Sequence, residues 1–154
     1  MDIHAVIAHL ESLDSVVVQR PGPGDGTPEV AWGDVFAYYS PDGGIPAAQP
    51  FATVVTKDYP GEPSSGLDAP GSFRVNVHAG TQEFERRTGH SPKDEGVEGP
   101  PPDARDVVIA HPVYGAYGWL AVVDPGPATE GDVRDLLTAA HAAARARHER
   151  RAST

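Results

Sequence analysis

At 154 residues the chain has the size of one domain, and 39% hydrophobic residues with 17 glycines and 16 prolines indicate a small core joined by long turns. The absence of cysteine excludes disulfides and thiolate metal sites. The formal net charge of -10, from 12 basic and 22 acidic residues, argues against nucleic-acid binding, because contacts to phosphate dominate that affinity.

Nothing in the hydropathy pattern indicates a membrane protein. No apolar run approaches the roughly 18 residues that a membrane span needs, and no basic leader precedes the first amphipathic segment. We therefore expect a soluble cytoplasmic protein with one domain over residues 1–154, present as a monomer or homodimer. Four arginines lie close to the C-terminus: Arg145, Arg147, Arg150 and Arg151. We expect them to complement the dipole of their own helix in solvent, with residues 148–154 frayed.

The first half of the chain predicts one helix and three strands. Apolar residues recur at helical spacing over 3–13, and Asp2 stands at the N-cap position. A run of three valines predicts a strand over 15–20, which a Gly- and Pro-rich stretch ends. Strands are expected over 32–39 and 51–57, separated by dense turn residues.

A strand over 73–78 has the clearest pattern, because its six residues alternate apolar and polar without a break. Successive side chains of a strand point to opposite faces, so the apolar half can enter a core while Arg74, Asn76 and His78 share the other face. That polar row is either a binding site or a solvated face. A solvated face is the commoner outcome on a half-buried strand, and it is our expectation here.

The second half predicts a short helix from Thr81 to Gly89, an exposed loop over 90–105, and a strand over 118–124. Thr129 and Asp132 resemble a capping box at the start of a long helix. Hairpin-length connections favour antiparallel pairing. We therefore predict an α+β fold, with a mainly antiparallel sheet of about five strands packed against N- and C-terminal helices that leave its second face open.

Two groups of side chains are candidates for ligand binding. Lys57 ends the third predicted strand, and pairing with the next strand would bring it close to the polar row of Arg74, Asn76 and His78, beside Trp32 or Tyr38. Two cations, an amide and an imidazole suit a small anionic or carbonyl-bearing ligand.

The second group lies in the segment 111–119, which holds one imidazole and three aromatic rings separated by small residues. His111, Tyr114 and Trp119 are the side chains expected to wall a pocket for a flat apolar ligand. The alternative is that these rings belong to the core. No cofactor and no metal is predicted, because the seven histidines include no pair at i and i+4 and no phosphate-binding loop or nucleophile elbow occurs.

Four strings carry a family resemblance: 31–34 (Ala-Trp-Gly-Asp), 49–61, 73–77 and 111–119. Over nearly the whole chain they resemble an uncharacterised bacterial family, domain of unknown function 6194. More distantly, the Phe-Ala-Thr strand at 51–53 and the Trp-bearing strand that ends at Asp124 resemble the MmcQ/YjbR group, an α+β fold sometimes described as DNA-binding-like. These resemblances imply the fold and assign no catalytic residue, since fold alone does not define a site.

Three functional hypotheses follow from these residues. The leading one is a small-molecule-binding protein that uses the open sheet face, as an accessory or self-protection protein in a specialised pathway. The second is a protein–protein interaction module without catalytic activity. The third is a small enzyme in which His78 or His111 serves as general acid or base.

Overall fold

A six-stranded antiparallel sheet forms the centre of the protein, in a computed structural model that describes residues 1–153. The strand order is β1-β2-β3-β4-β6-β5, one strand more than expected, since the short β5 was not predicted. The strands are β1 (Val16–Gln19), β2 (Val35–Tyr39), β3 (Ala52–Val55), β4 (Arg74–His78), β5 (Val108–Ala110) and β6 (Trp119–Val123). The α-helices are α1 (Ile3–Glu11), α2 (Thr81–Thr88) and α3 (Glu130–Ala152). The α+β prediction is confirmed.

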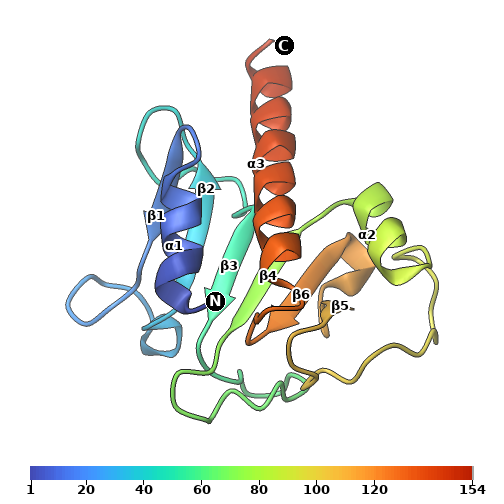
Figure 1. The fold of residues 1–154 in the computed structure, drawn as a ribbon. Coiled ribbons are helices and arrows are strands. Elements are labelled where there is room, and N and C mark those ends of the chain that lie inside the picture. The colour runs from blue at the N-terminus through green and yellow to red at the C-terminus, as the bar shows by residue number, and fades with distance from the viewer. Residues whose placement is uncertain (154) are drawn as a thin grey trace.

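Helices α1 and α3 lie side by side on the same face of the sheet, whereas α2 packs at the end that carries β5 (Figure 1). The predicted cap of α1 is present, since the Asp2 carboxylate accepts a hydrogen bond of 2.8 Å from the Ala5 N–H. The apolar stripes of both terminal helices enter one core with the inner face of the sheet.

The predicted capping box of α3 is wrong. Thr129 occupies the N-cap position, but its side chain donates to the Asp106 carboxylate instead of capping the helix. Asp106 itself accepts the N–H groups of Gly126, Ala128 and Thr129, and so satisfies the backbone donors before α3 from outside the helix. Asp132 instead accepts from Arg87 of α2, at 2.7 Å.

The C-terminal segment that we expected to fray is helical up to Ala152, while Thr154 lies outside the described residues. Residues 90–105 contain no helix or strand and are mostly exposed. Within residues 1–153 no helix is both long and apolar enough to cross a membrane.

Strand β2 begins three residues later than expected. The 3-10 turn η1 (Glu29–Ala31) precedes it, and Gly33 then takes a φ of +88°, which an L-residue rarely adopts. Strand β3 also ends early, at Val55, because the Thr56 N–H turns away to donate to the Asp34 carboxylate. Side-chain alternation therefore cannot be extended from β3 to Lys57.

Strand β4 is buried on both faces. Val75 and Val77 pack under the helices as predicted, but Arg74 is only 6% exposed and Asn76 3% on the opposite face. The expectation of a solvated polar face is therefore wrong at β4. The segments that cover these two polar side chains create the main candidate site.

Candidate functional site

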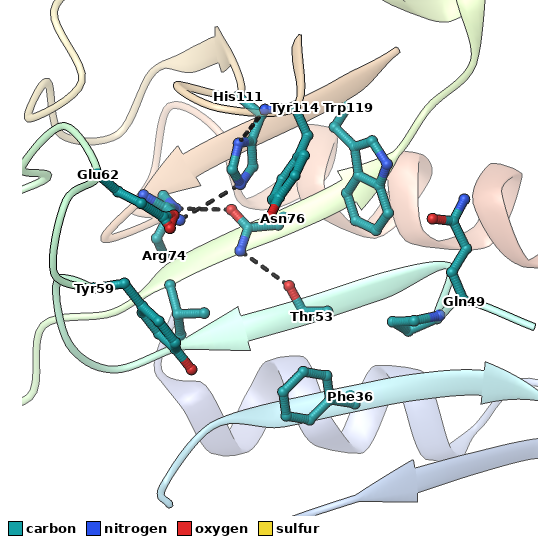
Figure 2. Close-up of a pocket in the computed structure, with 12 residues that line it drawn as sticks. Phe36, Gln49, Thr53, Tyr59, Glu62, Arg74, Asn76, His111, Tyr114 and Trp119 are labelled. Carbon is teal, nitrogen blue, oxygen red and sulfur yellow. Dashed lines mark hydrogen bonds between the residues drawn. The ribbon is translucent and has the colours of Figure 1, made fainter. Parts of the chain in front are cut away.

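A cavity of about 280 Å³ lies on the sheet face opposite α1 and α3. The register aligns its floor, because Thr53 of β3 pairs with Asn76 of β4 and Phe36 of β2 pairs with Thr53. Residues on paired positions share a face, so side chains from three strands point into the same space. Figure 2 shows these side chains below His111, Tyr114 and Trp119.

The loop between β3 and β4 covers one end of this floor. The Asp58 carboxylate accepts the N–H groups of Ser65 and Leu67 and folds the loop back on itself. Arg105 donates to the carbonyls of Ser65 and Gly66, at 2.7 and 2.6 Å, and ties the loop to the segment before β5. Ser65 is consequently fully buried, above β4.

Arg74 is held rigidly by neutral partners. Its Nε donates to Asn76 Oδ1 at 2.8 Å and its Nη1 donates to Ser65 Oγ at 2.9 Å. Asn76 Nδ2 then donates to Thr53 Oγ1 at 3.0 Å, and the three side chains form the chain of bonds drawn in Figure 2. The Thr53 hydroxyl keeps its own proton for an acceptor, and Thr53 lines the cavity.

The tautomer of His111 follows from its backbone contacts. Its Nδ1 accepts hydrogen bonds from the N–H groups of Val113 and Tyr114, both at 3.0 Å. An imidazole nitrogen that accepts carries no proton, so the proton of the neutral ring is on Nε2. Burial, and then the charge of Arg74, lower the pKa of His111 to about 3. At neutral pH His111 is therefore an uncharged donor.

Two donors consequently face each other with no acceptor between them. His111 Nε2 lies 3.4 Å from Arg74 Nη2, and both atoms carry hydrogen. Within residues 1–153 no carboxylate forms an ion pair with Arg74. Burial lowers the pKa of Arg74, and the nearby charge of Glu62, which lines the same cavity, opposes that shift. An acceptor placed in the cavity can bond to both donors.

Aromatic and apolar side chains complete the walls. Trp119 is 8% exposed and Tyr114 is 49% exposed, so Tyr114 stands at the rim. Phe36, Pro50 and Val55 line the side opposite these rings. A cavity with a polar end at Arg74 and flat apolar walls elsewhere suits an amphipathic small molecule.

A buried carboxylate supports the wall at Tyr59. Asp34 is 1% exposed and accepts from the Thr56 N–H, the Thr56 hydroxyl, the Lys57 ammonium and the Tyr59 hydroxyl. Burial, and then the hydrogen bond to Asp34, raise the pKa of Tyr59. Lys57 therefore serves a structural ion pair of 2.9 Å behind the cavity wall.

The structure brings together five of the predicted site residues and separates the other four. The cavity is lined by Arg74, Asn76, His111, Tyr114 and Trp119, from both predicted groups. Lys57 is bound to Asp34, and the Trp32 indole donates to the Thr27 carbonyl in a distant loop. Tyr38 shares the sheet face but lies outside the cavity lining, and His78 stacks behind Trp119 with ring centres 5.3 Å apart.

Several lining residues were not predicted. Phe36, Thr53 and Val55 follow the same alternation as Arg74 and could have been found by extending the register across the sheet. Gln49, Pro50, Tyr59 and Glu62 come from loops, whose paths leave no periodic signal. No group of three or more potential metal-binding His, Asp or Glu side chains occurs in the described part of the chain.

The comparisons with known proteins identify a family. The sequence model of a family of unknown function (DUF6194) matches residues 1–153. The chain belongs to this family. No curated protein and no solved structure matches the chain, so the distant MmcQ/YjbR-like relation stays a prediction. The family as described assigns no activity, and the function of this member has to be argued from its own cavity.

Proposed function

We propose that this member of the family binds a small molecule with one acidic group and a flat apolar body, in the cavity over β3 and β4. The observation that carries the proposal is the buried Arg74 guanidinium, which lacks an ion pair and faces a second donor across 3.4 Å. A ligand carboxylate there would accept from Arg74 Nη2 and His111 Nε2 together.

Energetics favour this assignment. A buried cation without a counter-ion is costly, because neutral partners recover only part of its lost hydration. Arg74 is nonetheless locked in place by Asn76 and Ser65 before any ligand arrives, so little side-chain entropy is lost on binding. Each charge-assisted hydrogen bond contributes roughly 1.5–3 kcal/mol, which makes the carboxylate the main determinant of affinity.

The rest of the cavity sets the ligand's size and shape. A volume of about 280 Å³ is near the lower end of small-molecule sites and too small for a large cofactor. Trp119 and Tyr114 offer ring surfaces on one side and Phe36 on another. An aromatic or similarly flat acid fits these walls, since stacked or edge-on rings add about 0.5–1.5 kcal/mol.

The two other hypotheses have weaker support. A general base needs a free lone pair, but the single basic lone pair of neutral His111, on Nδ1, already accepts from two backbone N–H groups, and its Nε2 carries the proton. An interaction module would favour a flat face, whereas this face is hollowed over β4. Binding in the cytoplasm by a monomer or homodimer stays a prediction.

Two measurements test the proposal. Native mass spectrometry of the protein purified from its own host should reveal a retained small acid. Binding of 2-naphthoate and of its uncharged amide, 2-naphthamide, should be followed by the fluorescence of Trp119 and by calorimetry. We expect the acid to bind at least tenfold more tightly, because its charged carboxylate offers two acceptor oxygens to Arg74 and His111, whereas the neutral amide offers one oxygen and a donating NH2 group.

Variants of Arg74 test whether this residue causes the difference in affinity between acid and amide. Arg74→Gln should abolish the preference for the acid, and Arg74→Lys should keep part of it, since the charge remains but the planar fork is lost. Arg86→Gln is the matched control, because it removes an exposed positive charge from α2 outside the cavity. Equal binding of acid and amide, an unchanged preference in Arg74→Gln, or no binding of either probe with no retained ligand would refute the proposal.

A further inference from the structure

A second cavity, of about 260 Å³, lies beside the C-terminal part of α3 and shares Gln49 with the first. It is enclosed by the last turns of α3, the connection between β2 and β3, and the end of β4. Four of its lining side chains are basic: His78, Arg147, His148 and Arg151. No acidic residue lines it, although the chain has 22 acids against 12 basic residues. The local charge is therefore opposite to that of the whole protein.

Three of these basic side chains, Arg147, His78 and His148, have unused hydrogen-bonding capacity within residues 1–153. Arg147 is half-buried, and the part of the chain that the structure describes offers it neither an ion pair nor a hydrogen bond. Within residues 1–153, His78 Nδ1 is buried without a hydrogen-bond partner, and His78 makes one ring contact, its stack on Trp119. His148 likewise makes no hydrogen bond within residues 1–153 and contacts only the Tyr39 ring, at 5.3 Å.

The charged groups close to Arg147 are mainly positive. Burial, and then Arg151 and Arg150, lower the pKa of Arg147, and the charge of Arg147 contributes to lowering that of His78. Hydrogen bonds mainly lower the pKa of Asp42, and the charge of His148 contributes, but Asp42 Oδ1 already accepts from the Ser40 hydroxyl and the Gly44 N–H in its own turn.

We infer that this cavity, which shares Gln49 with the first, is a second binding site, for a tetrahedral oxyanion of the phosphate type. A guanidinium without a partner and two imidazole side chains that line the same cavity match the several acceptor oxygens of a phosphoryl group. His78 comes from β4, whereas Arg147 and His148 come from α3, so a bound anion would be contacted from more than one side. The C-terminal arginines that we expected to serve only their own helix thus include Arg147, which lines a cavity.

Titration of the ¹⁵N-labelled full chain with inorganic phosphate, at ionic strength held constant with sodium chloride, tests the inference. We expect saturable shifts of the resonances of His78, Arg147 and His148. Arg147→Gln should weaken phosphate binding about tenfold or more, as for loss of a charge-assisted contact. His148→Gln, at a more peripheral position, should weaken it less and serves if Arg147→Gln fails to fold.

Arg150→Gln is the matched control, because it removes the same charge from the same helix at an exposed position outside the cavity. It should change the affinity less than twofold. Equal weakening by both arginine variants, or shifts that sodium chloride alone reproduces, would show general charge screening and overturn the site.

Binding of phenyl phosphate distinguishes the two possible sources of the anion. Tighter binding than inorganic phosphate indicates a phosphorylated molecule, and equal binding indicates the free anion. Arg74→Gln should leave phosphate binding unchanged, because Arg74 lines the first cavity and not the second. The proposal for each cavity can therefore be refuted without refuting the other.

Discussion

Acidification from pH 7 to pH 5 should destabilise the fold by about 2 kcal/mol through His111 alone. The pKa of this residue is lowered from 6.5 to about 3 in the folded protein, first by burial and then by Arg74. Between these values the unfolded chain binds a proton at His111 that the folded chain excludes, so the free energy of unfolding falls as the pH falls. Because pH 5 lies about 1.5 units below the unfolded pKa and each unit is worth about 1.36 kcal/mol, the loss is about 2 kcal/mol.

Urea unfolding at both pH values, for the wild type and His111→Gln, measures this loss. Glutamine keeps an oxygen that can accept a backbone N–H but has no proton to gain in this range. His9 and His78, whose pKa values are also lowered, titrate in both proteins and cancel in the comparison. The wild type should lose about 2 kcal/mol more than the variant. A difference below about 0.5 kcal/mol would refute a buried neutral His111 and with it the tautomer assigned to the site.

Two further substitutions test the walls of the first cavity. Asp34→Asn should lower the free energy of unfolding by about 3 kcal/mol, because it removes a buried carboxylate that accepts from four donors, among them the partly exposed Lys57 and Tyr59. Thermal melting should show a drop of roughly 6–12 °C, against almost none for the exposed Asp68→Asn; a drop under about 2 °C would contradict the role of Asp34. Glu62→Gln should tighten 2-naphthoate about fivefold and leave 2-naphthamide unchanged, since it removes a like charge worth ~1 kcal/mol. Weaker binding of the acid would mean that Glu62 contacts the ligand.

The alternation over 73–78 predicted the structure of β4 well, because a period of two is imposed by the strand itself. It predicted that Val75 and Val77 would pack under the helices and that Arg74 and Asn76 would share a face. It carried no information about what covers the polar face. The covering loop is shaped by contacts between residues far apart in sequence, such as Arg105 with the Ser65 carbonyl.

Lys57 shows where extrapolation from a strand ends. Its position two residues after Val55 would place it on the cavity face if β3 continued. The strand stops because Asp34, 22 residues earlier than Thr56, takes the Thr56 N–H that the sheet would otherwise use. The sequence assigned no role to Asp34, because neither spacing nor composition reveals that a carboxylate will be buried and accept four donors.

The overall charge of the protein sharpens the case for both cavities. With 22 acidic residues against 12 basic ones, carboxylates are abundant, and the exposed or partly exposed arginines at positions 86, 87, 105, 134 and 145 all find one. Arg74 and Arg147 remain without an ion pair within residues 1–153, although both are more buried than most of these. Burial raises the free-energy cost of a cation without a counter-ion. Because acidic residues are abundant in this chain, a lack of carboxylates does not explain why Arg74 and Arg147 are unpaired in the described part of the chain. The anionic ligands proposed for the two cavities would supply a reason at both sites.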